Sequence, residues 1–282
     1  MFDLHMHTNL SDGELSVIEL LSRLKEKNIE LFSITDHNHA LAYNYIEDTL
    51  QMKMIKGSEI TTSYEGVVIE ILGYNINPTI INNWYNDFYS EENMIRNEIK
   101  LFSELKDISR KNGFKISDNL EMDKIIKGES KKAIYYYLKE TYPDFIYPSY
   151  KVFFRTALSN PKSDFFIDEG RYYPSISEVI ELIHKANGVA ILAHPYEYGI
   201  SEIEELYEYL IDLGIDGIEC FHPSMSINQS IKTAKYCCKH NLLGSGGSDF
   251  HRDNRLISHG VRAHKDLLDM ECFDWFNKSD DN

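Results

Sequence analysis

The chain has 282 residues and a formal net charge of −16, and 43% of its residues are hydrophobic. This composition is typical of a globular protein, and no apolar stretch reaches the 18 or more residues that a membrane-spanning helix needs. The excess of acidic residues argues against a protein that coats long DNA or RNA, because the phosphate backbone is itself negative. A small anionic substrate stays compatible with this charge if some acidic residues bind divalent metals.

The amino terminus and the cysteines indicate a cytoplasmic protein. The chain begins directly with a segment that we expect to form a strand, without the basic region and apolar run of a secretory signal. The cysteines lack C-x-x-C spacing, and two of them are adjacent, which does not suit a disulfide framework. We therefore expect four reduced thiols, at Cys220, Cys237, Cys238 and Cys272.

Strand-like and helix-like segments alternate in the first quarter of the chain. Ser16 followed by Glu19 has the spacing of a capping box, and apolar residues then recur at helical intervals. The predicted elements of this region are strands at 2–5, 31–34, 54–60 and 67–74 and helices at 16–27 and 40–50.

Residues 78–173 have a different composition, rich in tyrosine, lysine and glutamate, and they predict a helical insertion with helices at 91–111 and 130–140. Aromatic runs such as Tyr135 to Tyr137 are best explained as packing between these helices. The alternative is that Tyr135, Tyr136, Tyr172 or Tyr173 stacks on a nucleotide base, as aromatic side chains do with unpaired nucleotides.

Alternation resumes at Ser175, where Glu178 again gives the capping-box spacing. Strands separated by helix-length segments predict mainly parallel pairing and an α/β fold, either an open sheet or a barrel. We therefore expect one domain made of residues 1–77 and 174–282, interrupted by the insertion at 78–173. The later predicted elements are strands at 189–192, 217–220 and 242–244 and helices at 202–213 and 227–240.

Histidine and acidic residues stand where the predicted strands end. They occur in the segments FDLHMH, FSITDH, IKGSEI, AILAHP and LLGSGGSDFH. Because the carboxyl ends of parallel strands meet at one edge of an α/β fold, we expect these side chains to converge there. The residues concerned are His5, His7, Asp36, His37, Glu59, His194, Asp249 and His251.

The spacing of His5 and His7 fits one shared ion, since side chains two residues apart on a strand point to the same face. An H-x-H pair alone is weak evidence, but its occurrence with the other four segments is strong. Imidazole and carboxylate donors without cysteine suit zinc, manganese or iron, and so many donors predict two or three divalent ions.

These five segments resemble the motifs of the PHP family, the polymerase and histidinol phosphatase metal-dependent phosphoesterases: H-x-H, T-D-H, a lone Glu, A-H-P and S-D-x-H. The resemblance covers residues 1–74 and about 174–260. It implies a distorted (β/α)7 barrel with up to three metals, and a helical lid insertion like that of the branch with nucleoside 3′,5′-bisphosphate phosphatases and short-oligonucleotide 5′ exonucleases. The implied activity is hydrolysis of a small phosphate ester by metal-activated water.

The resemblance also implies which residues bind each metal. Glu70 stands where similar proteins usually have a histidine. A glutamate inside an apolar run is costly to bury unless it binds metal, which favours Glu70 as a ligand. The alternative is that this face of the strand is open to solvent and that the site holds only two metals. Asp36 would face away from His37 and so have a structural role, and His39 would lie in solvent. The implied sets are His5, His7, Glu59 and Asp249 for the first metal, Glu59, His194 and Glu70 for the second, and Asp12, His37 and His251 for the third.

Catalysis and substrate binding involve further candidates. Besides Asp249, His222 at the end of a predicted strand is a candidate substrate contact or proton donor, and a metal-bound water is the other candidate donor. His222 could also be an ordinary loop histidine. Phosphate oxygens not held by metal need arginine or lysine, but each such candidate could also be a solvated surface charge. These candidates are Arg171, Arg252, Arg255, Lys131 and Lys132.

Three other functions stay open at this point. An amidohydrolase-like enzyme would use a similar metal cage on a C–N bond, a histidinol-phosphatase-like monoesterase would usually carry a G-S-V-H segment that is absent here, and a degenerate scaffold would only bind metal. We expect a small phosphorylated substrate, such as a nucleotide or short oligonucleotide, and neither long nucleic acid nor a membrane as partner.

Overall fold

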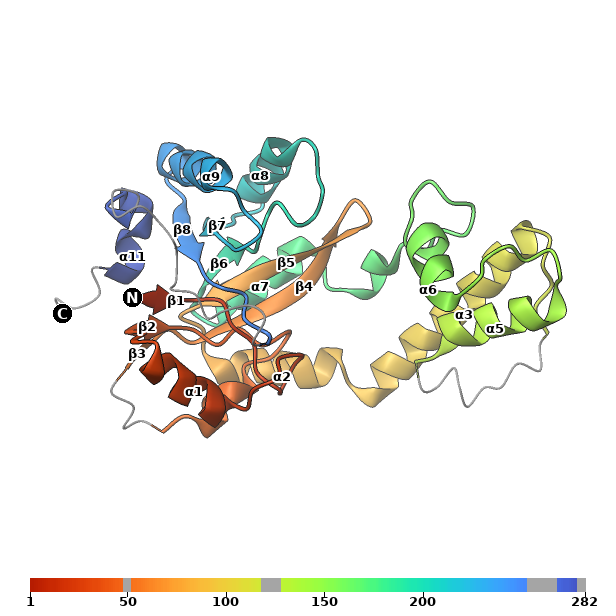
Figure 1. The fold of residues 1–282 in the computed structure, drawn as a ribbon, viewed down its shortest axis with the longest axis horizontal. Helices are drawn as coiled ribbons and strands as arrows, with labels where there is room; N and C mark the ends of the chain where they lie inside the picture. The colour runs from red at the N-terminus through yellow and green to blue at the C-terminus, as the bar shows by residue number, and fades with distance from the viewer. Residues whose placement is uncertain (48–51, 118–127, 253–267, 278–282) are drawn as a thin grey trace. The chain divides into compact units, whose positions relative to one another are not determined.

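The computed structural model describes residues 1–47, 52–117, 128–252 and 268–277 (Figure 1). The chain forms two compact units. The first consists of Met1–Tyr85 with Tyr173–Asn282, and the second of Asn86–Tyr172. Helix α2 (Pro78–Phe88) runs across the first of these boundaries.

The first unit is a mixed α/β structure with two sheets. One sheet has the order β1-β2-β3 and the other β4-β5-β6-β7-β8. The strands are β1 (Phe2–Asp3), β2 (Leu31–Phe32), β3 (Lys53–Met54), β4 (Gly57–Tyr64), β5 (Val67–Tyr74), β6 (Val189–Leu192), β7 (Gly217–Phe221) and β8 (Leu243–Gly246).

Most strand pairs are parallel, as the alternation of elements predicted, but β5 is antiparallel to both of its neighbours, β4 and β6. The turn between β4 and β5 explains the first exception. It consists of Glu65 and Gly66, both with positive φ, at 50° and 79°. Two such residues form the tight turn of a β-hairpin, so no crossover helix separates these strands. The strand predicted at 54–60 is divided in the structure into two elements, β3 and β4.

Backbone contacts beyond the strands bring the two sheets together. His7 donates its N–H to the carbonyl of Phe250 at 2.9 Å, next to a parallel bridge between Met6 and Phe250. On the other side, Asn38 donates its N–H to the carbonyl of Glu59 at 2.7 Å. The chain just after β1 therefore lies beside the chain just after β8, and the chain after β2 lies beside β4 (Figure 1).

Helices cover the sheets of the first unit and complete its apolar core. Helix α7 packs against β4, β5 and β6, and α9 packs against β7 and β8. Three helices begin with a complete capping box, at Ser16, Ser175 and Ser226. The helix predicted at 40–50 is a 3-10 helix at Leu41–Tyr45, and residues 48–51 lie outside the described ranges. The helices are α1 (Val17–Glu26), α7 (Ile176–Lys185), α8 (Ile203–Asp212), α9 (Ile227–His240) and α11 (Asp274–Asn277), with a further 3-10 helix at Glu271–Phe273.

The second unit is helical and has its own aromatic core. Tyr135 is only 4% exposed and packs with Phe145 and Phe153, so the idea that it stacks on a base is wrong. Tyr136, by contrast, is exposed. Its elements are α3 (Glu91–Lys111), α5 (Ser130–Thr141), α6 (Tyr150–Phe153), a π-helical turn at Phe154–Leu158 and a 3-10 helix at Glu169–Tyr172.

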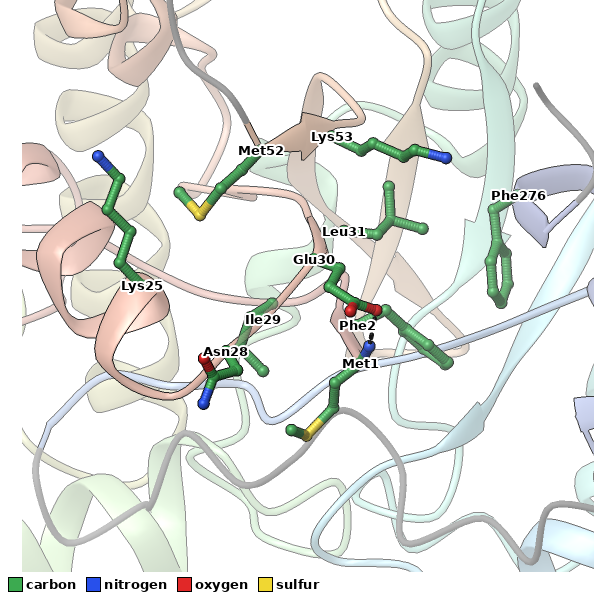
Figure 2. A pocket seen from close by; sticks show the side chains of 10 residues that line it. All are labelled: Met1, Phe2, Lys25, Asn28, Ile29, Glu30, Leu31, Met52, Lys53 and Phe276. Carbon is green, nitrogen blue, oxygen red and sulfur yellow. Dashed lines mark hydrogen bonds and ion pairs between the residues drawn. The ribbon is translucent and has the colours of Figure 1, made fainter.

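A cavity of about 630 Å³ lies at the amino-terminal ends of β1, β2 and β3 (Figure 2). Phe2, Leu31 and Phe276 give it apolar walls, and Glu30 in its lining binds the terminal ammonium of Met1 at 2.6 Å. None of the expected metal ligands lines this cavity. All four cysteines are free thiols, and among the described helices none is both long and apolar enough to cross a membrane.

Candidate metal centre

The residues expected to bind metal converge in the first unit. His5 and His7 follow β1 and are fully buried, with ring centroids 5.3 Å apart. Both Nε2 atoms lie 3.2 Å from Oε2 of Glu59. The same two atoms lie 3.5 and 3.3 Å from Oδ1 of Asp249. Four side chains from three segments distant in sequence therefore meet at one point.

Glu59 lies at the centre of this arrangement. It is on β4 and its side chain is 1% exposed. Besides His5 and His7, its Oε2 lies 3.3 Å from Nδ1 of His37, and its Oε1 lies 3.0 Å from Nε2 of His194. One carboxylate thus contacts four imidazoles, which is the contact pattern of a bridging ligand.

Asp12 brings a second group of histidines together. Its Oδ1 lies 3.0 Å from Nε2 of His251, 3.5 Å from Nε2 of His37 and 3.8 Å from Nδ1 of His7. The rings of His7 and His251 stack with centroids 4.2 Å apart. Asp12 is half exposed, so this group opens toward solvent more than the group around Glu59.

Asp36 fixes the loop that carries Asp12. It is buried and accepts hydrogen bonds from the N–H and the hydroxyl of Thr8, both at 2.7 Å, and from the hydroxyl of Ser11 at 2.8 Å. These contacts agree with the structural role that strand alternation predicted for it. Asn9 and Leu10 lie between Thr8 and Ser11, so the hydrogen bonds of Asp36 to both sides of this segment also restrict their positions.

The expectation that His39 lies in solvent is wrong. The side chain is buried, with its Nε2 3.0 Å from the carbonyl of Leu10 and its ring edge-on to Tyr85. It contacts a loop residue and a residue of helix α2 that local sequence alone does not place together.

Glu70 points its carboxylate into the cluster. It is on β5, and its oxygens lie 3.4 Å from Nδ1 of His37 and 3.3 Å from Nε2 of His194. Its backbone N–H donates to the hydroxyl of Tyr198 at 2.9 Å, which ties β5 to the chain after β6. The side chain is 20% exposed, so it lies at the solvent edge of the cluster and can reach a cation there.

Within the part of the chain that the structure describes, the donor atoms form five groups in which all atoms lie within 4.8 Å of one another. These groups are His7, Asp12, His37 and His251; His5, His7 and Asp249; His5, Glu59 and His194; His37, Glu59 and Glu70; and Glu197, His222 and Asp249.

His222 lies against the same cluster. Its Nε2 is 3.3 Å from Oδ2 of Asp249, and its Nδ1 is 2.6 Å from the hydroxyl of Ser224 and 3.7 Å from Glu197. Asp249 has a φ of 49°, a left-handed conformation that is uncommon outside glycine. Such strain is often found where a side chain must be aimed precisely, and here it aims a carboxylate at four imidazoles, those of His5, His7, His222 and His251.

Glu219, the middle residue of β7, belongs to the cluster but to none of the five sequence motifs. It is fully buried, with Oε1 3.1 Å from Nδ1 of His5, and its Oε2 accepts the backbone N–H of His194 at 2.7 Å. The sequence does contain a signal for it, because a glutamate inside the apolar strand GIECF is as costly to bury as Glu70.

The carboxylates favour positive charge on His5. Burial alone would lower the pKa of this imidazole, but the negative charges of Glu59, Glu219 and Asp249 outweigh burial and raise the pKa well above its ordinary value. The carboxyl groups respond in the opposite direction. Burial would raise the pKa of Glu59 and of Asp249, but the neighbouring histidines lower both well below the usual range.

His194 shows the same balance. Burial would lower its pKa, but hydrogen bonds to Glu59 and Glu70 raise it to about 11. A proton on His194 therefore supplies positive charge that this set of acids requires. Divalent cations would supply the same charge more compactly, and they would allow the imidazoles to be neutral.

The buried donor atoms fit metal ions. Several side-chain atoms of the cluster have no hydrogen-bond partner among the described residues, and a buried polar atom left without one costs about 1–3 kcal/mol. A cation with nitrogen and oxygen ligands would satisfy them, and the described groups contain no cysteine, so manganese, iron and zinc all fit. The atoms are His5 Nε2, His7 Nδ1 and Nε2, His37 Nδ1, Glu59 Oε2, His194 Nδ1 and His222 Nε2.

The candidate phosphate contacts differ in their surroundings. Arg252 follows His251 directly and is exposed. Lys132 is also exposed, on α5, and Arg255 lies outside the described residues. All three stay predictions.

Two other candidates already have acidic partners in the second unit. Lys131 Nζ lies 2.7 Å from Glu169 and above the ring of Phe154, and Arg171 lies 3.0 Å from Glu104. These ion pairs offset the two positive charges within the unit. A role for Lys131 or Arg171 in phosphate binding stays a prediction, and each would have to exchange its carboxylate for the phosphate.

Comparisons with known proteins agree with this geometry. The model of the PHP domain matches residues 3–146, just over half of the chain. A 5′-3′ exoribonuclease of Haemophilus influenzae is 28% identical over 97% of both chains. A 3′,5′-nucleoside bisphosphate phosphatase of Chromobacterium violaceum is 24% identical over 88% of this chain and 86% of that protein.

Solved structures show the same fold. A protein from Chromobacterium violaceum described as an amidohydrolase has a TM-score of 0.62 at 21% identity, over 94% of this chain and 92% of the other. A protein from Bifidobacterium adolescentis described as a putative metal-dependent phosphoesterase has a TM-score of 0.59 at 22% identity, over 95% and 93%. At these identities the likeness extends to the fold and not to the reaction.

Proposed function

The chain belongs to the PHP domain family, and from this premise we propose that it is a metal-dependent phosphoesterase that hydrolyses a small phosphate ester of a nucleotide with activated water. The observation that carries the proposal is the position of Glu59, which contacts four histidines from three other segments. A structural core would not assemble so many ionisable groups without cations to balance them.

The proposed architecture is a distorted seven-stranded barrel. Its support is the pair of backbone contacts that join the two sheets, from His7 to Phe250 on one side and from Asn38 to Glu59 on the other. With β3 and β4 counted as one interrupted strand, these contacts would close the strands into a ring. The second unit, Asn86–Tyr172, would be the main part of its insertion, whose predicted bounds are residues 78–173.

We assign three metal positions rather than two. With neutral imidazoles, the carboxylates of Asp12, Glu59, Glu70, Glu197, Asp249 and Glu219 carry six negative charges. Two divalent cations would leave this set net negative, whereas three would neutralise it. A phosphate ester, itself an anion, favours the second case. The first position would use His5, His7, Glu59 and Asp249, the second Glu59, Glu70 and His194, and the third Asp12, His37 and His251.

Cations at these positions would activate water for attack and offset the charge of the phosphoryl group. The protein itself orients the reactants. Asp36 holds the loop of Asp12, and the strained backbone of Asp249 directs its carboxylate toward His5 and His7. His222 is the candidate proton donor for the leaving oxygen, because its Nε2 lies beside Asp249 and can hold a proton there.

The proposed substrate is a nucleotide, a nucleoside bisphosphate or the 5′ end of a short oligonucleotide. The support is that relatives along most of the chain are named for such reactions, and that the chain is strongly acidic, which disfavours long nucleic acid. Arg252 is the candidate phosphate contact beside the cluster, with Lys131, Lys132 and Arg171 as candidates from the second unit.

The test is phosphate release from a panel of nucleoside bisphosphates and 5′-phosphorylated short oligonucleotides, before and after removal of metal with a chelator. Asp249→Asn should lower turnover at least about 100-fold, since it removes a charge aimed at four imidazoles. Asp216→Asn is the matched control, because Asp216 also pairs with a histidine, His184, but outside the candidate site. Hydrolysis of amides without any phosphate release would favour the amidohydrolase alternative and reject the proposal.

A further inference from the structure

Glu219 makes two contacts that serve different candidate metal positions. Oε1 of Glu219 contacts Nδ1 of His5, which is a ligand of the first candidate metal position. Oε2 accepts a hydrogen bond from the backbone N–H of His194, which is a ligand of the second. Both partners precede Glu219 in sequence, His5 by 214 residues and His194 by 25 residues. A single buried carboxylate therefore joins two ligand segments.

The contact with His5 determines which ring nitrogen is free. A carboxylate only accepts hydrogen bonds, so Nδ1 of His5 must carry the proton that it donates to Glu219. In a neutral ring this leaves the lone pair on Nε2, the atom that faces Glu59 and Asp249. Glu219 thus selects the tautomer that can bind a cation.

We infer that Glu219 is a positioning residue for metal binding, which sets the tautomer of His5 and the location of His194 together. This inference rests on the proposed function, since it assumes that both histidines bind metal. It assigns to β7 a role in the site that the sequence motifs do not contain.

Glu219→Gln tests the inference because only one of the two terminal atoms of the amide, the oxygen, can accept a hydrogen bond. The N–H of His194 requires the amide oxygen, which leaves the NH2 group facing Nδ1 of His5. That nitrogen must then accept, so the proton moves to Nε2 and blocks the lone pair. If the side-chain amide is flipped instead, its NH2 group faces the backbone N–H of His194. Two hydrogen-bond donors then face each other, which displaces His194 from its position as a metal ligand. Either outcome should weaken metal binding by about 10–100-fold.

The experiment compares zinc affinity of the wild type, Glu219→Gln and Glu219→Asp by competition with a chromophoric chelator. Aspartate keeps the charge and both acceptors, so it should recover part of the affinity that glutamine loses. Glu178→Gln is the matched control: Glu178 also accepts a backbone N–H, from Ser175 at 2.8 Å, but at the start of α7. Its zinc affinity should equal that of the wild type.

NMR of histidine-labelled, zinc-loaded protein supplies a readout that a merely structural role would not change. The wild type should show a protected Nδ1–H proton on His5, assigned with His5→Gln, and Glu219→Gln should lose it while His251 keeps its resonances. A wild type without that proton overturns the inference even if the variant does not fold. Equal zinc affinity and equal His5 signals in wild type and Glu219→Gln overturn this inference but leave the proposed function standing. A wild type that binds neither zinc nor manganese overturns the proposed function as well.

Discussion

Metal binding to this protein should release protons, and the surroundings of His194 indicate how strongly. In the metal-free protein, Glu59 and Glu70 hold the pKa of this imidazole at about 11, against the opposing effects of burial and of His5. His194 is therefore protonated at neutral pH and must lose that proton to become a ligand. His5, whose pKa is raised as well, must lose one too.

The size of this effect follows from the pKa. At about pH 7.5 the pH lies roughly 3.5 units below the pKa of His194. Removing the proton at this pH therefore costs about 5 kcal/mol, at 1.36 kcal/mol per unit. Metal binding has to supply this free energy. Each proton released makes the binding constant rise about tenfold per pH unit, until the pH passes the pKa.

The assay is calorimetric titration with Mn²⁺ in two buffers that have different heats of ionisation, whose difference gives the number of protons released. We expect more than one proton per chain at pH 7.5. His184→Gln should not change this number, because His184 binds Asp216 outside the cluster. An observed heat that does not depend on the buffer would refute the reasoning.

The stability of the metal-free protein should decrease as the pH rises, because of the same raised pKa. The pKa of His194 is raised in the folded state above its ordinary value of 6.5. Its contribution to stability is therefore fully present below pH 6.5 and is lost as the pH rises toward 11. The thermal midpoint of chelator-treated protein should fall over this range, and a midpoint that rises with pH would contradict the assignment.

Three substitutions test other parts of the structure. Glu70→Gln should lower the metal content by about one ion per chain in elemental analysis, and unchanged content would exclude Glu70 as a ligand. Gly247→Ala places a Cβ 2.4 Å from the backbone N of His5, so unfolding by denaturant should show a loss of about 1–3 kcal/mol together with weaker metal binding. Ser175→Ala removes the cap of α7 and should cost about 1 kcal/mol in the same assay without changing metal content.

Local patterns predicted the helices well. The helix expected at 227–240 has those bounds in the structure, because Ser226 caps its start and Asn241 ends it in a left-handed conformation. The long helix at 91–111 was also placed correctly. These signals lie within a few residues of the element that they define, so a single sequence contains them.

Features that depend on distant residues were harder to predict. The antiparallel position of β5 between β4 and β6 depends on a pairing across the insertion, which no local period reports. Burial of His39 depends on Tyr85 and Leu10. Glu219 acquires its meaning only from His5, 214 residues away. The motifs identified the groups that converge, whereas the side chains that orient them required the structure.

The position of Glu59 also has a consequence for how the site fills. Its two oxygens are shared among four imidazoles that belong to all three proposed ligand sets. A first cation that draws this carboxylate into place organises the partners of the next, so later ions should enter more easily than the first. Occupancy should then rise steeply over a narrow range of free metal, and partly filled chains should be scarce.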